Sequence, residues 1–161
     1  MRIYVASSWR NKFQRAVVET LRSLGHEVYD FKNPPKNSGF SWREIAPNWE
    51  SWTPHEYRAA LNCARAEEGF RADMEGLDAD ACVLVQPCGT SAHLELGWAC
   101  GKGLQTAVLY PLDFPSEDGS KVPQIEPELM VKMADVLLLS RADMLTWVKG
   151  VEAHVWARAK R

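Results

Sequence analysis

The sequence predicts an α/β fold in which helices cover both faces of a parallel sheet. Strand-like and helix-like segments alternate along the chain, and this spacing is typical of right-handed β-α-β crossovers. The run ACVLVQP at 81–87 is continuously apolar, as in a central parallel strand buried on both faces. A length of 161 residues suits one domain with a proper hydrophobic core. We therefore expect a single domain over 1–161.

The first half of the pattern begins with RIYVAS (2–7), a short run of β-branched and aromatic residues that predicts a strand. A helix follows over 11–25, because Phe13, Val17 and Leu21 recur at helical spacing.

The next strand is HEVYDF (26–31). A loop insertion over about 32–54 is rich in Pro, Asn, Ser and Trp. The segment 55–79 predicts one long helix or two.

The second half repeats the alternation after the apolar strand. We expect helices at 91–103, 127–134 and 141–161, and strands at 104–111 and 135–140. Five strands fit a flavodoxin-like three-layer sandwich with the strand order 2-1-3-4-5.

Composition and charge exclude several classes of protein. The chain is 46% hydrophobic and 25% charged, as expected of a soluble globular protein, and a net charge of −2 gives no electrostatic case for nucleic acid or a membrane surface. Its apolar stretches fall short of the roughly 20 residues that a membrane span needs, and the first hydrophobic run ends at Ala6, too early for a signal peptide. We expect a cytoplasmic protein.

The four cysteines form no CxxC pair, and no histidine stands at the spacing of a metal finger. We interpret the cysteines as reduced thiols, with no disulfide framework. Neither a metal nor another cofactor is expected.

A sheet of this order binds ligands at the carboxyl ends of its strands, near the switch point between the first and third strands. The residues expected there follow strand one (7–10) and strand three (87–91), together with the long loop after strand two. Ser8 and Arg10 in the first loop are candidates for a phosphate cradle, although Arg10 fits a solvated surface equally well. Gly89 and Ser91 offer small residues and backbone N–H groups to an anion, and an ordinary helix cap is compatible with that role.

Glu95 is the main catalytic candidate. It follows the turn PCGTS and stands among apolar residues in SAHLELGWACGKG. One interpretation is a charge near a helix N-terminus, where the helix dipole stabilises it by about 0.3–1 kcal/mol. The other is a carboxylate that attacks an electrophilic carbon, as in retaining glycosidases.

Three further residues have two interpretations each. Asp73 is a catalytic candidate or one more charge on a solvated helix face. Tyr4 lies within the first strand, where core packing is the default and a buried hydroxyl needs a partner. Trp42 belongs to the Trp-rich loop, whose aromatic rings either stack a planar base or form a small core that holds the loop down.

These pieces together resemble the nucleoside 2-deoxyribosyltransferase family, including the related 2'-deoxynucleoside 5'-monophosphate N-glycosidases. The resemblance rests on RIYVASSW, ADMEGLDADACVLV and, most specifically, HLELGWACGKG, in that order along roughly residues 2 to 140. Gly89 stands where some transferases carry an acidic residue, and the Trp-rich insertion belongs to neither branch.

The resemblance implies a role for each candidate. Glu95 would attack the anomeric carbon of the sugar and form a glycosyl-enzyme intermediate, while Asp73 would hold and protonate the base and Tyr4 would position the carboxylate or the sugar. The residues corresponding to those that bind the 5'-phosphate in the monophosphate glycosidases are Ser8, Arg10, Gly89 and Ser91. The family also completes its site from a neighbouring subunit, so we expect a homo-oligomer.

The sequence thus predicts an enzyme that cleaves or transfers the N-glycosidic bond of a (deoxy)nucleoside or nucleoside 5'-monophosphate. Hydrolysis and transfer both remain open. One alternative is a glycohydrolase of an NAD-type dinucleotide, and another is a non-catalytic nucleotide-binding sensor. A flavin binder is disfavoured, because SSWRNKF is not the Ser/Thr/Gly-rich phosphate loop of flavodoxin-like flavin proteins.

Overall fold

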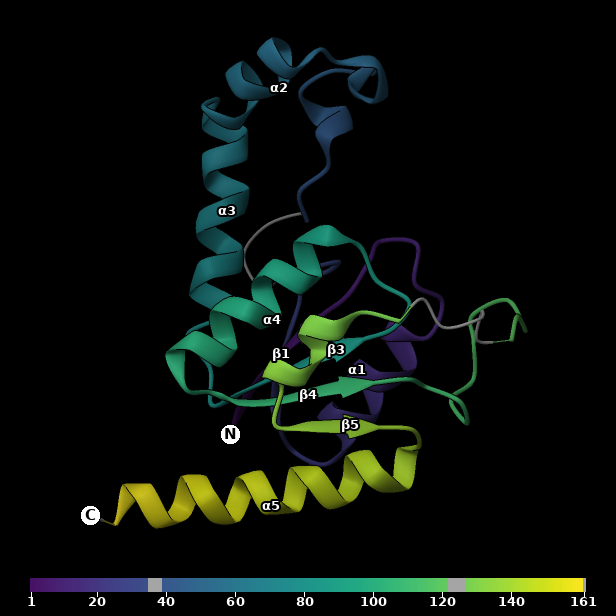
Figure 1. Cartoon of the computed structure of the whole chain (residues 1–161), viewed down its shortest axis with the longest axis vertical. Coiled ribbons are helices and arrows are strands. Elements are labelled where there is room, and N and C mark those ends of the chain that lie inside the picture. The colour runs from purple at the N-terminus through teal and green to yellow at the C-terminus, as the bar shows by residue number, and fades with distance from the viewer. Residues whose placement is uncertain (35–38, 122–126, 161) are drawn as a thin grey trace. The chain divides into compact units, whose positions relative to one another are not determined.

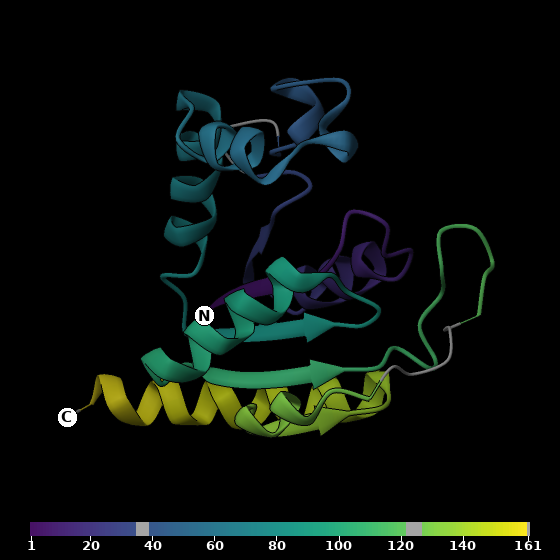
Figure 2. The ribbon, with the colours of Figure 1, turned by 45° about the horizontal axis from the view of Figure 1, so that its top comes forward.

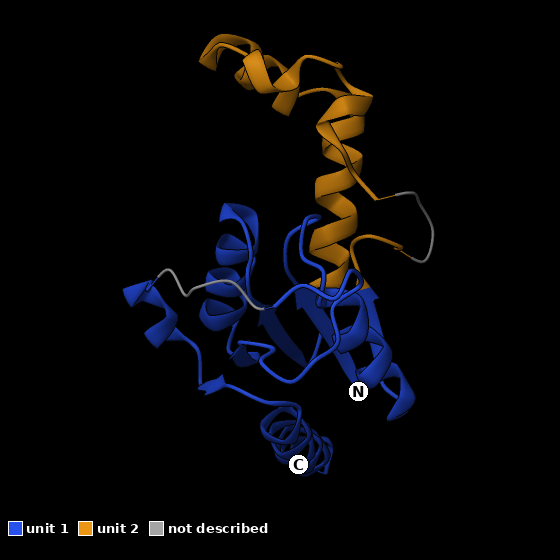
Figure 3. Cartoon of the chain, turned by 90° about the vertical axis from the view of Figure 1, so that its right-hand side faces the viewer, with its two compact units in different colours: residues 1–29, 79–161 blue, residues 30–78 orange. Residues whose placement is uncertain are grey.

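The computed structural model describes residues 1–34, 39–121 and 127–160. The chain divides into two compact units, shown in different colours in Figure 3. Unit 1 comprises Met1–Tyr29 and Ala79–Arg161, and unit 2 comprises Asp30–Asp78. Unit 2 therefore extends beyond the predicted insertion at about 32–54 and includes the helical segment that follows it.

Unit 1 is built on a five-stranded parallel sheet in the order β2-β1-β3-β4-β5, which confirms the predicted flavodoxin-like α/β fold (Figure 1). The strands are β1 (Arg2–Ala6), β2 (Glu27–Asp30), β3 (Ala81–Val85), β4 (Gln105–Leu109) and β5 (Val136–Leu138). All five residues of β3 are buried, as its unbroken apolar run predicts for a strand covered on both faces. Only Asp30, the last residue of β2, falls in unit 2.

One face of the sheet packs against α1 (Gln14–Ser23) and α5 (Arg141–Ala159). Alternate residues of the strands point to this face, which is the geometry that a period of two requires. The main contacts of this core are made by Ile3, Val5, Val17, Leu21, Val83, Val85, Ala107, Leu109, Met144 and Val148.

The other face is covered by α4 (Thr90–Lys102), which packs on β1, β3 and β4. Figure 2 shows α4 and α5 on opposite faces of the sheet. Ala92, Leu96 and Ala99 are the buried residues of α4. The helix ends at Gly103, whose φ of 73° lies in the left-handed region that favours glycine.

The segment 127–134 differs from its prediction. Instead of an α-helix it forms a 3-10 helix, η3 (Leu129–Met133). The Glu128 side chain caps this element by accepting a hydrogen bond from the Met130 backbone N–H at 3.0 Å. Among the described residues, no helix is both long enough and apolar enough to cross a membrane.

Unit 2 holds the 3-10 helices η1 (Trp42–Glu44) and η2 (Trp49–Ser51), followed by α2 (Pro54–Leu61) and α3 (Ala64–Gly76). The single segment predicted at 55–79 is therefore two helices, which was one of the two expected forms. The first of them begins at a capping box, since the Thr53 hydroxyl accepts from the Glu56 N–H and the Glu56 carboxylate accepts from the Thr53 N–H.

The core of unit 2 contains an aromatic cluster, which we define as Phe40, Trp42, Trp52 and Tyr57. Trp42 makes edge-to-face contacts with the other three rings, at centroid distances of 4.7, 5.6 and 5.6 Å. Such contacts are worth about 0.5–1.5 kcal/mol each beyond the area that they bury. The Trp-rich segment therefore has a small core of its own, as one of the two interpretations of its tryptophans expects.

Candidate functional site

The loops that follow β1 and β3 are tied to each other by buried hydrogen bonds. The Ser7 hydroxyl donates to the Val85 carbonyl at 2.9 Å, and the Asn11 side-chain amide donates to the carbonyls of Val85 and Pro87 at 3.1 and 2.9 Å. These bonds fix the carboxyl ends of the two strands at the switch point, where the strand order predicts a ligand site.

Asn11 is a residue that the sequence analysis missed. Its side-chain oxygen accepts hydrogen bonds from the backbone N–H groups of Phe13 and Gln14, at 2.7 and 3.0 Å, and so caps the beginning of α1. One side chain thereby joins the first helix to the loop after β3. The available signal was an asparagine directly before a helix, which is a favoured capping position.

The N-terminus of α4 is open to solvent. Gly89, Thr90 and Ser91 are exposed, and within the described part of the chain no side chain caps this end. The cap residue is Gly89, so neither Thr90 nor Ser91 serves as the ordinary helix cap that was considered for them. Backbone N–H groups at an uncapped helix start, with the positive end of the helix dipole, favour an anion.

Glu95 lies half-buried on α4. Its carboxylate raises the pKa of both Cys82 and Cys88, although burial is the larger cause for each thiol. The pKa of Cys88 reaches about 12. Both thiols are therefore neutral at physiological pH, and Glu95 is the negative charge among these three groups.

The surroundings of Glu95 differ in one respect from the apolar setting that the sequence suggested. Its neighbour Leu94 is 71% exposed, so this helix has a solvent-facing side. Glu95 remains partly shielded from solvent, which separates it from a freely solvated carboxylate.

Tyr4 is fully buried in β1, and its ring stacks on Tyr29 at a centroid distance of 5.1 Å and an interplanar angle of 11°. It stands in register with Cys82 of β3. Since Cys82 is under the electrostatic influence of Glu95, the structure brings Tyr4 and Glu95 to the same region of the α4 face. The core packing expected of Tyr4 is also present.

The phosphate candidates after β1 lie in a tight turn. The Ser8 carbonyl accepts from the Asn11 N–H at 2.9 Å, and the Ser8 hydroxyl accepts from the Arg10 N–H at 3.2 Å. Arg10 is exposed, and Ser8 is half-buried. This turn leaves the Arg10 side chain accessible to a ligand from solvent.

Asp73 and Trp42 belong to unit 2. Asp73 is half-buried on α3, and its backbone carbonyl accepts from the Leu77 N–H at 2.9 Å. Trp42 is half-buried within the aromatic cluster. Their roles toward a substrate stay predictions.

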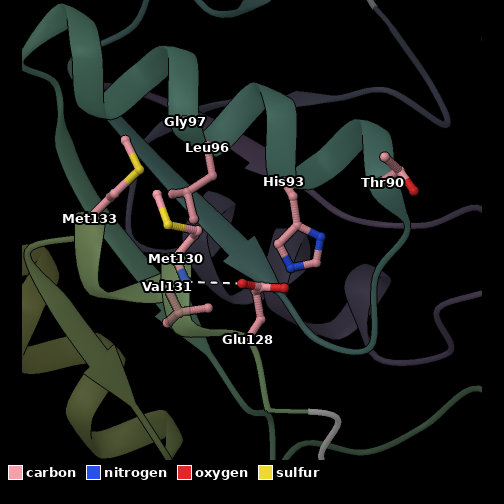
Figure 4. A pocket seen from close by; sticks show the side chains of 8 residues that line it. All are labelled: Thr90, His93, Leu96, Gly97, Glu128, Met130, Val131 and Met133. Atoms are coloured by element: carbon pink, nitrogen blue, oxygen red, sulfur yellow. Dashed lines mark hydrogen bonds between the residues drawn. The ribbon is translucent and has the colours of Figure 1, made fainter.

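A pocket of about 350 Å³ lies between α4 and η3 (Figure 4). It is lined by Thr90, His93, Leu96, Gly97, Glu128, Met130, Val131 and Met133. Residues two apart on a helix point to nearly opposite sides, so the side of α4 that presents His93 and Gly97 is not the side of Glu95. This pocket is separate from the Glu95 site.

His93 links the pocket to the start of α4. Its Nδ1 lies 3.1 Å from the Gly89 carbonyl and 3.6 Å from the Cys88 sulfur. Because a carbonyl only accepts, Nδ1 carries the proton in this hydrogen bond. His93 therefore holds the turn that precedes the helix, as the structural interpretation of this residue expects.

Within the residues that the structure describes, no group of three or more His, Cys, Asp or Glu side chains is arranged to hold a metal ion. No protein-family model matches the sequence, and no curated protein matches it.

Proposed function

We propose that this chain cleaves or transfers the N-glycosidic bond of a (deoxy)nucleoside or a nucleoside 5'-monophosphate, in the manner of the nucleoside 2-deoxyribosyltransferases. One observation carries the proposal. A half-buried carboxylate, Glu95, lies within α4 behind a helix N-terminus whose backbone N–H groups are open, next to the switch point of the sheet. A nucleophile and an anion-binding helix end thus belong to the same helix.

The reaction needs few groups. A Glu95 oxygen attacks the anomeric carbon as the bond from that carbon to the base nitrogen breaks, and the bonding electrons leave with the base. Asp73 supplies a proton to the departing base in this proposal. Water or a second base then attacks the same carbon, breaks its bond to the Glu95 oxygen and restores the carboxylate.

Substrate binding follows from the same geometry. The N–H groups at Gly89 and Ser91, with Ser8 and Arg10 from the loop after β1, are placed to take a 5'-phosphate. Tyr4 would orient the sugar or the carboxylate, and Trp42 would contribute to binding the base. The homo-oligomer expected from the family resemblance belongs to this proposal and is testable by sedimentation.

The deciding experiment measures free base released from a panel of nucleosides and 5'-monophosphates, with and without a second base. Glu95→Gln should lower turnover by about 10³-fold or more, because no carboxylate nucleophile remains. Glu67→Gln, the same change at an exposed carboxylate of α3, is the control and should retain wild-type turnover.

The pattern of products separates the remaining possibilities. Base release without an acceptor indicates hydrolysis, and release only with a second base indicates transfer. Normal turnover by Glu95→Gln would overturn the nucleophile assignment. Turnover of a dinucleotide alone, or ligand binding without any turnover, would replace the proposal with the glycohydrolase or the sensor.

A further inference from the structure

The segment before the aromatic cluster packs directly onto the backbone of α3. A Cβ placed on Gly69 would lie 2.8 Å from the Cβ of Phe40 and 2.9 Å from its Cγ and Cδ2. Real Cβ atoms do not approach other carbons that closely, so a glycine is required at this position for Phe40 to keep its place. The Phe40 side chain is therefore held against the helix itself.

A second residue of α3 holds the same segment. Arg65 forms an ion pair with Glu44 at 2.6 Å, donates to the Gly39 carbonyl at 3.1 Å, and places its guanidinium 5.4 Å from the centre of the Phe40 ring. Its hydrogen bond with Arg65 is the largest cause of the lowered pKa of Glu44. Phe40 is thus fixed from two successive turns of the helix.

Asp73 continues this line of residues. Arg65, Gly69 and Asp73 are spaced four apart on α3, so they share one face of the helix, and successive members are about 6 Å apart along its axis. The Phe40 side chain on Gly69 is therefore one helical turn from the position of Asp73.

The charges of this face favour a hydrogen-bond donor. The one arginine of the line is shared between Glu44, at 2.6 Å, and Glu68, at 3.7 Å. Its positive charge is thus offset by two carboxylates, and Asp73 adds a further acceptor group to the face. A carboxylate accepts hydrogen bonds from an exocyclic amino group and not from a carbonyl oxygen.

We propose that Phe40, held by Gly69 and Arg65, determines which base the site takes: a planar base that presents an exocyclic amino group toward Asp73. This inference rests on the proposed function and names its substrate class. Phe40 supplies the apolar contact for the ring of the base, and Asp73 supplies the acceptor for its amino edge. Keto bases without an amino group are disfavoured, because their carbonyl oxygens face a carboxylate.

The test compares kcat/KM for amino and keto substrates, deoxyadenosine against deoxyinosine and deoxycytidine against deoxyuridine, each also as its 5'-monophosphate. The wild-type enzyme should prefer the amino member of each pair. Phe40→Ala should reduce that preference by about 2- to 10-fold, mainly through KM. Gly69→Ala should have the same effect because it displaces the ring without removing it, and Phe40→Leu should restore part of the preference.

Two matched controls accompany these variants. Phe70→Ala removes an exposed ring from the same helix, and Gly150→Ala adds a Cβ where nothing lies within 4 Å. Both should keep the wild-type preference. Circular dichroism checks that each variant is folded, and Phe40→Leu serves if Gly69→Ala does not fold.

The outcomes separate this inference from the proposed function. Loss of kcat/KM by the same factor for all substrates in Phe40→Ala would overturn the inference, and so would a wild-type preference for keto bases. Binding of free adenine and hypoxanthine to Glu95→Gln, followed by tryptophan fluorescence, tests base recognition without turnover. If the wild-type protein releases no base but adenine binding depends on Phe40, the proposed function fails and the recognition of the base stands.

Discussion

The two units of this chain are stabilised in different ways. Unit 1 has an aliphatic core on a parallel sheet, where every residue of β3 is buried. Unit 2 relies on edge-to-face aromatic contacts, a capped pair of helices and the Arg65–Glu44 ion pair. In its described part, α2 buries only Ala60, and neither η1 nor η2 has a buried residue.

The comparison teaches how each unit holds its candidate site residues. In unit 1, strand pairing sets the place of Tyr4 opposite Cys82, and buried hydrogen bonds of Asn11 fix the loop that precedes α4. In unit 2, the segment near Asp73 is held by a few large rings and by one ion pair. The first kind of support is distributed over many contacts, while the second depends on a few side chains.

The largest expected effect is the loss of a core leucine from unit 1. Leu84→Ala should lower the free energy of unfolding by about 2–5 kcal/mol, because the side chain is fully buried in the central strand and leaves a cavity. Leu61→Ala in unit 2 makes the same change at a side chain that is 44% exposed, and should cost less than about 0.5 kcal/mol. Urea unfolding measures both, and equal losses would break the comparison.

A smaller effect is expected where unit 1 depends on one polar side chain. Asn11→Ala should lower the free energy of unfolding by about 1–3 kcal/mol, because buried carbonyl and N–H groups lose their partner. It should also weaken substrate binding through the loop before α4. Asn48→Ala, at an exposed residue that provides no side-chain cap to η2, is the control. An unchanged melting temperature in Asn11→Ala would contradict the bridging role.

The smallest effect is a difference in acid sensitivity. Burial lowers the pKa of His26 below its ordinary value of 6.5, with Glu152, at 3.8 Å, opposing that shift and the N-terminal amine adding to it. The unfolded chain therefore binds a proton at His26 before the folded chain does, and stability falls as the pH drops from about 6.5 toward the folded pKa. His26→Gln should flatten this part of a curve of urea midpoint against pH.

Glu44 in unit 2 responds in a lower window. Its pKa is lowered from 4.5, so the stabilising ion pair is present above that pH and is lost as the pH falls through the folded value. Hydrogen exchange at a series of pH values should report a loss of protection near His26 before any loss near Glu44. The reverse order would contradict these assignments.

Several features of the fold follow from local pattern alone. The unbroken apolar run at 81–87 identified β3, and alternation with helical segments predicted the parallel sheet and its order. Gly103 ends α4 because its positive φ suits a residue without a Cβ. These predictions succeeded because hydrophobic period and glycine position act within a few residues.

Other features escaped the pattern. The helix expected at 127–134 is a 3-10 turn, and its short sequence gives no periodicity that would separate the two forms. The long loop after β2 is part of a unit with its own core, because rings spread over 40–57 meet only when the segment folds back. Neither result can be read from spacing.

The sequence by itself determined the flavodoxin-like sheet, the helix that carries Glu95, and the candidate residues for the site, because these depend on local periodicity and on residue type. Only the tertiary structure decided that Asn11 bridges two loops, that Gly89 leaves the start of α4 open, and that Phe40 sits on Gly69. Each of these joins or exposes groups through the path of the folded chain. Contacts between segments far apart in sequence leave no periodic signal, since they arise only when burial and hydrogen bonding are satisfied together.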